Sequence, residues 1–282
     1  AWSRTRRGLA LTVLQGPGRG PAAAMNIGIR HAKSDIIVRL DGHCRPRAGY
    51  LTRSVRTLVD EDAGVVGGVW EIEPGAASRI ARAIAAVVAH PIGSGGAAYR
   101  DASRTAGPLE SVDTVPFGCF RRALWERVGG YDEHLISNED YDFNYRVIQD
   151  GHAVLLNREI RSTYGARSTL GALGKQYFRY GFWKTQMLRK SPGALQLRQV
   201  TPALVLPWVC TTTLLALTVG GFIGYIAAAL YPALVAAVVM RIAAARGELG
   251  LLVPVFAAIV IQHGAWSAGF WHGMLYPSPN SA

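Results

Sequence analysis

The sequence predicts an α/β domain followed by about three membrane-spanning helices. Through the N-terminal part of the chain, segments with the periodicity of strands alternate with segments that have the periodicity of helices, which favours a sheet covered by helices. The C-terminal part differs, because only three charged residues lie between Thr201 and Gly273. Such a stretch is typical of a membrane region. We therefore place a domain with its juxtamembrane segment at residues 1–198 and a transmembrane region at residues 199–282.

Hydrophobic periodicity, together with glycine and proline, predicts the elements of the domain in turn. The alternation of strands and helices favours a mostly parallel sheet. In chain order, we expect a candidate strand at Leu9–Leu14, a helix at Pro21–Ile29, a strand at Ile36–Leu40, a helix at Ala48–Asp60, a strand at Gly64–Ile72, a helix at Ala76–Ala89, a strand at Ser111–Phe120 and a short helix at Arg122–Val128.

The apolar tail and the basic residues beside it favour a membrane protein with a cytoplasmic domain. The formal net charge of +11 suits either nucleic acid or an anionic membrane surface, and the adjoining apolar tail favours the membrane. Basic residues precede the first span and separate the second from the third, so the positive-inside rule places the domain in the cytoplasm. We expect spans of close to the roughly 20 residues that a bilayer requires at about Ala203–Val219, Phe222–Met240 and Leu249–Trp271.

Two polar residues, Gln262 and His263, interrupt the third apolar stretch. Ionisable groups at membrane depth can mark a functional site, so a catalytic histidine is one interpretation. Polar residues more often join membrane helices through hydrogen bonds, and this is the interpretation that we favour.

Asp41 stands at the end of a short apolar run and is followed by Gly42 and His43. Ligands of open α/β sheets bind beyond the carboxyl ends of the strands, where an acid can hold a metal ion or a ligand hydroxyl. Asp-Gly is also a common turn. The local pattern leaves both interpretations open.

A second group of acids comprises Glu139, Asp140 and Asp142. Ser137 or Asn138 can cap a helix there, and the helix dipole favours acids in its first turn. A carboxylate at a helix start beside a cleft is also well placed to act as a general base.

A third group, Gln176–Lys184, combines aromatic and basic residues just before the apolar tail. It has the composition of an amphipathic helix at a membrane surface. As a binding site, its arginine and glutamine would face diphosphate oxygens, and its aromatic rings would support a sugar or a lipid. Spacing alone does not separate these interpretations.

Taken in order, these segments resemble the family 2 glycosyltransferases of the GT-A (Rossmann-like) fold. The resemblance runs from about Pro17 to Trp183. More narrowly, the chain resembles the bacterial membrane-bound members that build exopolysaccharides on lipid carriers, such as succinoglycan-type glucosyltransferases. It rests on Asp41, the stretch from Gly118 to Asp132, the Asn138–Asp140 acids and Gln176–Tyr180.

The resemblance implies a role for each matching residue. Asp41 and His43 match the Asp-x-Asp metal motif, with His43 in place of the second aspartate, so they would hold a divalent Mg²⁺ or Mn²⁺ ion. Asp140 matches the catalytic base, which deprotonates the acceptor hydroxyl for one direct, inverting displacement. The Gln-x-x-Arg-Trp motif appears with tyrosine in place of tryptophan. The residues that would contact the substrate or donor are Asp41, Glu139, Gln176, Arg179 and Tyr180.

The implied function is an inverting transfer of a sugar from a nucleotide-diphosphate sugar, expected to be a UDP-sugar, to a hydroxyl of a lipid-linked or polysaccharide acceptor. We expect this at the bacterial inner membrane, in cell-surface polysaccharide biosynthesis. The alternative is a non-catalytic membrane scaffold or a degenerate subunit. Nucleic acid is disfavoured as a partner, because no known binding motif is present. Asp41 comes early compared with the family, so we expect a domain that is incomplete at its N-terminus.

Overall fold

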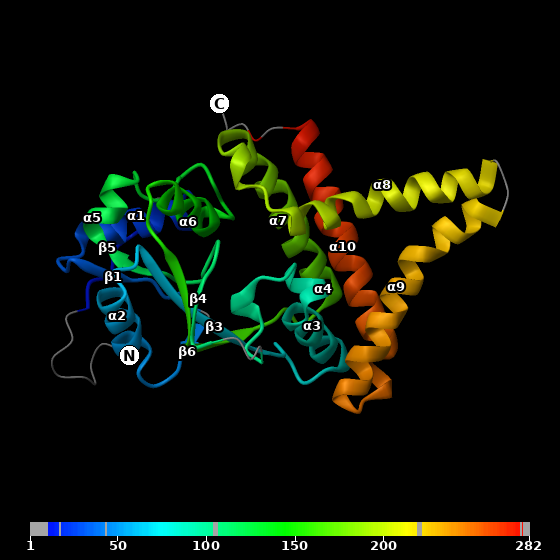
Figure 1. Ribbon diagram of the computed structural model, residues 1–282, viewed down its shortest axis with the longest axis horizontal. Helices are drawn as coiled ribbons and strands as arrows, with labels where there is room; N and C mark the ends of the chain where they lie inside the picture. The colour runs from blue at the N-terminus through cyan, green and yellow to red at the C-terminus, as the bar shows by residue number, and fades with distance from the viewer. Residues whose placement is uncertain are drawn as a thin grey trace.

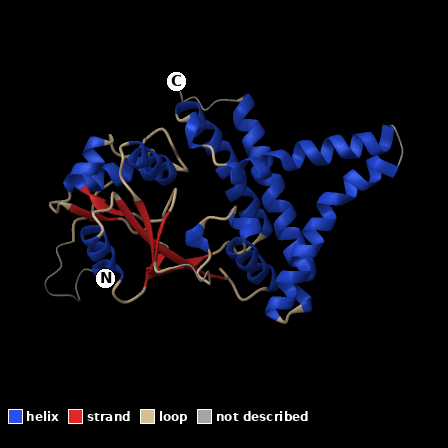
Figure 2. Ribbon diagram, in the orientation of Figure 1, coloured by secondary structure: helices blue, strands red, loops and turns tan. Residues whose placement is uncertain are grey.

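Six strands form one mixed sheet within the parts of the chain that the computed structural model describes, which are residues 11–16, 18–42, 44–103, 107–218, 222–276 and 278 (Figure 1). The strands lie in the order β1, β5, β3, β6, β2, and β4 also pairs with β6. Figure 2 shows the sheet on one side of the molecule and an entirely helical region on the other. The strands are β1 (Ile36–Val38), β2 (Cys44–Pro46), β3 (Val65–Glu73), β4 (Leu109–Ser111), β5 (Cys119–Arg121) and β6 (Val154–Gly165).

The expectation of a mostly parallel sheet is wrong. Among the described strands, only β3 and β6 pair in parallel, and the other pairs are antiparallel. Parallel pairing requires a long crossover connection, which the chain between β3 and β6 provides. The expected strand Ser111–Phe120 is also wrong, because the chain forms two three-residue strands with a loop between them. Phe117 in that loop has a φ of 56°, which an extended strand does not permit.

The longest strand, β6, is absent from the elements expected from the sequence. Its buried positions include Val154, Leu156 and Ile160, and polar residues stand between them. Arg158 is also buried and interrupts this apolar pattern. It forms an ion pair with Glu110, with 3.0 Å between Arg158 Nη2 and Glu110 Oε2. A strand whose inner face carries a paired arginine does not display the simple alternation that identifies half-buried strands.

The helices of the domain agree closely with those expected. The predicted helices at Pro21–Ile29, Ala48–Asp60, Ala76–Ala89 and Arg122–Val128 are confirmed with shifts of a few residues at their ends. Of the candidate strand Leu9–Leu14, residues 9 and 10 lie outside the described residues, and the remainder forms no strand. The helices are α1 (Pro21–His31), α2 (Tyr50–Asp60), α3 (Arg79–Ala89), α4 (Pro91–Ser94), α5 (Arg122–Arg127), α6 (Glu139–Gln149) and α7 (Leu170–Lys190).

A cluster of aromatic rings holds α6 against the sheet. The Phe143 ring lies 5.0 Å from that of Phe120 on β5 and 4.8 Å from that of Tyr131, measured between centroids. Asn26 of α1 fixes the Tyr131 backbone, since its side chain accepts from the amide at 3.0 Å and donates to the carbonyl at 2.8 Å. This buried packing sets the position of the first turn of α6, where the second group of acids lies.

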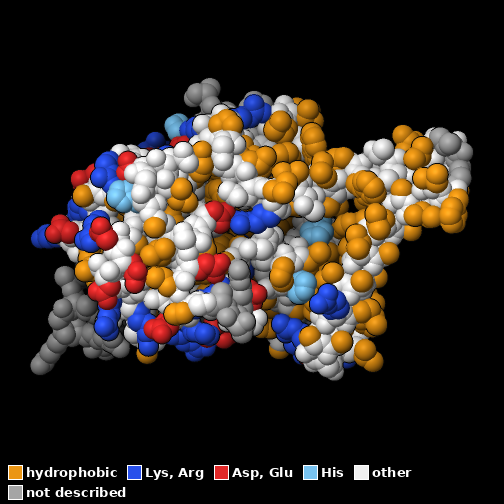
Figure 3. All heavy atoms as spheres, viewed as in Figure 1, with side chains coloured by type: hydrophobic (Ala, Val, Ile, Leu, Met, Phe, Trp, Pro, Cys, Tyr) orange, Lys and Arg blue, Asp and Glu red, His pale blue; other side chains and the backbone are white. Residues whose placement is uncertain are grey.

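Three C-terminal helices are long and apolar enough to cross a membrane, as expected. They are α8 (Leu197–Thr218), α9 (Phe222–Arg246) and α10 (Leu252–Leu275), the last preceded by a short 3₁₀ turn at Leu249–Leu251. In Figure 1, α10 lies along α7, whereas α8 and α9 project away as an arm. Figure 3 shows apolar side chains over this arm and charged side chains concentrated on the sheet domain. The distribution fits a membrane-facing arm.

Glycines allow α7 and α10 to approach closely. A Cβ atom at Gly181 of α7 would clash with the Trp266 carbonyl oxygen of α10. Likewise, a Cβ atom at Gly269 of α10 would clash with the Phe178 carbonyl oxygen of α7. Small residues at such crossings are a common feature of packed apolar helices. The helix that carries the third sequence cluster is therefore held directly against a candidate membrane helix.

Candidate active site

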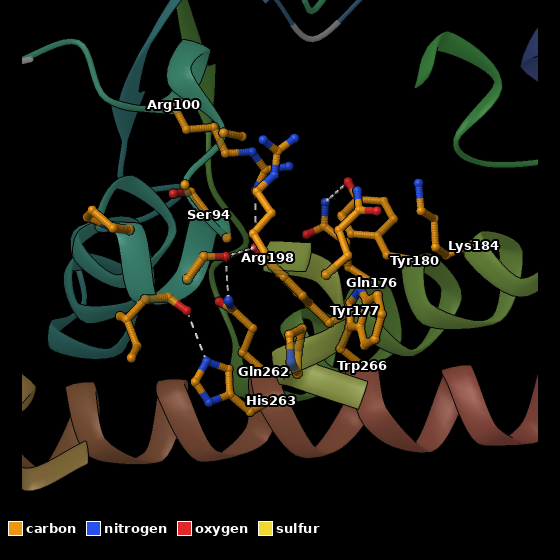
Figure 4. Close-up of a pocket in the computed structure, with 18 of the residues that line it drawn as sticks. Ser94, Arg100, Gln176, Tyr177, Tyr180, Lys184, Arg198, Gln262, His263 and Trp266 are labelled. Carbon is orange, nitrogen blue, oxygen red and sulfur yellow. Dashed lines mark hydrogen bonds between the residues drawn. The ribbon is translucent and has the colours of Figure 1, made fainter. Parts of the chain in front are cut away.

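A cavity of about 1030 Å³ lies between the sheet domain and the three C-terminal helices. Its walls come from the end of β1, the start of α6, one face of α7 and parts of α8, α9 and α10. Figure 4 shows lining side chains of α7 and α10, among them Gln176, Tyr180 and Gln262. His43 lies outside the described residues. All the other residues predicted to form the site line this one cavity, namely Asp41, Glu139, Asp140, Gln176, Arg179 and Tyr180.

The described lining of the cavity is strongly basic. It contains three carboxylates, Asp41, Glu139 and Asp140. It also contains seven lysine and arginine side chains, so the formal positive charges outnumber the formal negative charges by four. Guanidinium and ammonium groups that converge on a cavity are suited to phosphate ligands. The seven are Arg39, Arg100, Arg167, Arg179, Lys184, Arg198 and Arg241.

Arg39 joins two of the three carboxylates. Its Nε atom lies 3.0 Å from Asp41 Oδ1, and its Nη2 atom lies 3.2 Å from Glu139 Oε1. The Glu139 side chain is only 8% exposed, and burial raises its pKa to about 7; the charge of Asp140 adds to this rise and Arg39 opposes it. Asp41 is more open, with 31% of its side chain exposed. Arg39 thus holds both carboxylates, and the Asp41 side chain is the more exposed of the two.

Asp140 lies in the first turn of α6, where one carboxylate oxygen accepts a hydrogen bond from the Tyr141 amide at 2.8 Å. No ion pair between described residues involves Asp140. Asn138 occupies the N-cap position with a φ of 67°, but its side chain does not cap the helix. It donates instead to the Tyr180 carbonyl oxygen at 3.2 Å, which ties the start of α6 to α7.

The third acid of this group has a different environment. Asp142 is buried and forms an ion pair with Arg146 one turn later, at 2.7 Å. Arg146 in turn donates to the backbone carbonyls of Val128 and Gly130. Asp142 therefore holds the α5–α6 connection, and it does not line the cavity.

The Gln176 side chain is engaged entirely by protein groups. Its Nε2 atom donates to the hydroxyls of Tyr180 at 2.7 Å and Tyr164 at 3.1 Å, and its Oε1 atom accepts from Arg167 Nε at 3.1 Å. An amide has two donor hydrogens and one acceptor oxygen, so these bonds use each of its polar atoms. In this arrangement Gln176 positions Tyr180, while Arg179 is exposed at the cavity wall.

Arg100 is a lining residue that the sequence did not single out. Its Nη1 atom donates to the Tyr177 hydroxyl at 3.1 Å, and its guanidinium lies 5.4 Å from the centroid of the Trp70 ring. Trp70 in turn stacks on Tyr164, with 4.2 Å between centroids. Arg100 belongs to a short 3₁₀ turn without hydrophobic periodicity, so no sequence signal pointed to it.

The polar pair on α10 contacts both a neighbouring helix and the sheet domain. His263 Nε2 lies 2.9 Å from the Ile92 carbonyl oxygen, so this nitrogen carries the proton and Nδ1 can accept from the Tyr231 hydroxyl at 3.2 Å. Gln262 Nε2 donates to the Gly93 carbonyl oxygen at 2.6 Å. The expected helix–helix hydrogen bond is confirmed by Tyr231 on α9. The bonds to α4 were not expected.

The described residues alone form no metal site. They contain no group of three or more metal-ligating side chains. Mg²⁺ is commonly held by one or two carboxylates together with substrate phosphates, and Asp41 supplies one accessible carboxylate at the cavity.

Comparisons with known proteins show which sequences and structures the chain is similar to. The family model "Glycosyl transferase family 2" matches residues 7–128. The chain is 28% identical over 265 residues to the succinoglycan biosynthesis protein ExoA of Rhizobium meliloti (strain 1021). This alignment covers 93% of this chain and 77% of the relative. A second relative comes from Methanococcus voltae and is named dolichyl N-acetyl-alpha-D-glucosaminyl phosphate 3-beta-D-2,3-diacetamido-2,3-dideoxy-beta-D-glucuronosyltransferase. The chain is 29% identical to it over 174 residues, and the aligned region covers 59% of this chain and 52% of the relative.

Among solved structures, GalNAc-T7 with UDP, GalNAc and Mn²⁺ is 14% identical, with a TM-score of 0.39 over 62% of this chain and 38% of that one. This likeness is too low to inform the fold or the site. The family match and the curated relatives confirm the resemblance seen in the sequence, and the fold class of an α/β domain followed by three apolar helices is confirmed as well. Residues 7–128 match the family 2 glycosyltransferase model, and the chain is a glycosyltransferase.

Proposed function

We propose that this glycosyltransferase moves a sugar from a nucleotide-diphosphate sugar, expected to be a UDP-sugar, to a hydroxyl of a lipid-linked or polysaccharide acceptor in cell-surface polysaccharide biosynthesis. One observation carries the proposal. A single basic cavity contains Asp41, Asp140 and Arg179, and the same cavity is walled by apolar C-terminal helices. The name of the Methanococcus voltae relative includes a dolichyl-linked sugar phosphate, which supports a lipid-linked acceptor.

In the donor half of the cavity, Asp41 and Arg179 would hold the diphosphate. A divalent metal bound by Asp41 would neutralise charge that develops on the leaving group. Arg39 keeps the Asp41 carboxylate in place through its ion pair. Arg179, exposed on α7 in the cavity lining, would contact the phosphate oxygens directly.

In the acceptor half, Asp140 would be the base that removes the proton of the attacking hydroxyl. A base must lie within about 2.6–3.2 Å of that hydroxyl when the acceptor is bound. Asp140 is better suited than its neighbour Glu139, because Glu139 is buried and already paired with Arg39. One displacement with a base on the acceptor side inverts the configuration at the anomeric carbon.

We further propose that residues 1–198 form a cytoplasmic domain at the bacterial inner membrane and that residues 199–282 anchor it there. Basic residues beside the apolar helices support this orientation by the positive-inside rule. The cavity supports it as well, because an acceptor held in the membrane would meet the donor where the domain contacts α8, α9 and α10.

The test is a donor screen with membranes that contain the full chain, labelled nucleotide sugars and Mg²⁺ or Mn²⁺. We expect transfer from at least one donor, loss of transfer on chelation, and a fall of about 10² to 10⁴ in turnover for Asp140→Asn. Asp60→Asn, which removes an exposed carboxylate on α2, is the matched control. Unchanged turnover in Asp140→Asn would refute the assignment of the base. If no donor is consumed, the non-catalytic alternative stands.

A further inference from the structure

Lys184 of α7 is a buried cation in the cavity wall without a carboxylate partner among the described residues. The Lys184 residue is only 3% exposed to solvent. Its Nζ atom lies 3.5 Å from the centroid of the Tyr141 ring, and its one hydrogen-bond contact between described residues is Met187 Sδ at 3.9 Å. Lysine is almost never fully buried unless it is paired.

The protein groups around Lys184 do not compensate for its burial. A thioether is a weak acceptor, and the Tyr141 ring face offers a cation–π contact that is smaller than the penalty of removing an ammonium from water. Burial accordingly lowers the pKa of Lys184 to about 7. An apolar side chain would fill this position at lower cost, so the ammonium requires a reason outside the packing.

A second cation adjoins the same position. Arg198, in the first turn of α8, pairs with Asp113, and Asp113 also accepts from the Tyr141 hydroxyl at 2.9 Å. Both Lys184 and Arg198 line the cavity. Figure 4 shows Lys184 rising from α7 on the same side of the helix as Tyr180 and Gln176, and it shows Arg198 in the same pocket.

The surroundings of Lys184 place it on the acceptor side of the proposed reaction. Its strongest charged neighbours include Asp113, Arg198 and Asp140. Arg198 stands at the start of the first apolar helix, where the domain meets the expected membrane surface. Apolar residues of the arm line the cavity beyond it, namely Pro202, Val205, Leu234 and Val238.

We propose that Lys184 and Arg198 bind a phosphate group of the acceptor, the group that connects its sugar to its lipid. This inference rests on the proposed function. A phosphate there would receive charge-assisted hydrogen bonds from both cations. The lipid would extend along the apolar residues of α8 and α9, and the sugar would reach Asp140.

Binding to the purified full chain tests the subsite without knowledge of the sugar. The probes are farnesyl phosphate, farnesol, and UDP with Mg²⁺. We expect wild type to bind farnesyl phosphate about tenfold or more tightly than farnesol, as a lost charge-assisted bond implies. Lys184→Met and Arg198→Gln should each remove most of this difference and leave the affinity for UDP unchanged. Lys175→Met, on the exposed face of the same helix, is the control.

Three outcomes are decisive. Equal affinity of wild type for farnesyl phosphate and farnesol overturns the subsite. A parallel loss of UDP affinity in Lys184→Met and Arg198→Gln assigns the two cations to the donor diphosphate and also overturns it. Absence of UDP binding in wild type, with farnesyl phosphate still discriminated, contradicts the proposed function and leaves the phosphate subsite supported. Arg198 is one-third exposed, so its variant remains informative if Lys184→Met does not fold.

Discussion

Gln262 on α10 donates a hydrogen bond to the backbone carbonyl of Gly93 at 2.6 Å, which connects an apolar C-terminal helix to α4, the short helix that precedes Arg100. The Tyr177 hydroxyl donates to the same carbonyl at 3.2 Å and accepts from Arg100 Nη1 at 3.1 Å. The helix expected to lie in the membrane therefore helps to position a cation in the cavity of the sheet domain.

Gln262→Leu should weaken substrate binding through this connection. Losing one buried hydrogen bond costs about 0.5–1.5 kcal/mol of stability and frees the loop before Arg100. We expect KM for the substrates to rise severalfold while the chain still folds, as steady-state kinetics and thermal unfolding in nanodiscs can measure. Ser267→Ala is the control, since Ser267 is also buried on α10 but donates to Ala203 of α8. An equal rise of KM in both variants would contradict the connection.

Close packing of α7 against α10 predicts a sharp difference between two glycines of one helix. A Cβ atom at Gly269 would clash with the Phe178 carbonyl oxygen, whereas a Cβ atom at Gly264 meets nothing within 4 Å. Gly269→Ala should therefore lower the melting temperature and reduce transfer, because α7 carries Gln176, Arg179 and Tyr180. Gly264→Ala should be neutral or slightly stabilising, since alanine favours a helix more than glycine does. Similar melting temperatures for the two variants would be inconsistent with this packing.

Arg39 should be essential for folding as well as for the site. Its removal leaves the buried carboxylate of Glu139 without its partner, and breaking a buried pair in this way costs about 3–5 kcal/mol. We expect Arg39→Met to lower the free energy of unfolding by this amount. Combining it with Glu139→Gln should restore part of the loss, as a double-mutant cycle measures. Additive effects of the two substitutions would show that the pair is not coupled.

Lys184 predicts two opposite pH dependences. Burial lowers its pKa to about 7 in the folded chain, so between about pH 7 and the ordinary lysine value the unfolded chain binds more protons, and stability rises with pH. Affinity for farnesyl phosphate should instead fall above pH 7, because Lys184 loses the charge that attracts the phosphate. The charged groups acting on it are Asp113, Arg198, Asp140 and Asp142. Lys184→Met should flatten both profiles between pH 7 and 9, and a slope that persists in the variant would assign it to another group.

Several features were predictable from local sequence because they depend on local physics. Helix α1 begins at Pro21 and α3 ends at Ala89, close to the expected bounds, since periodicity and turn residues act over a few positions. The three apolar helices follow from composition alone. Strand β6 and the antiparallel pairs were not predictable, because pairing partners and the buried Arg158–Glu110 ion pair come from distant segments.

The sequence by itself determined the class of domain, the number of apolar helices and the identities of the three acids and of one cation, Arg179, that meet in the cavity. Only the tertiary structure decided what each of them contacts. It paired Glu139 with Arg39, directed Asp142 to Arg146, engaged Gln176 with two tyrosines and left Lys184 buried without a carboxylate partner in the described part of the chain. Motif spacing specifies which residues are present, whereas their charge states and partners depend on burial and on groups up to a hundred residues away.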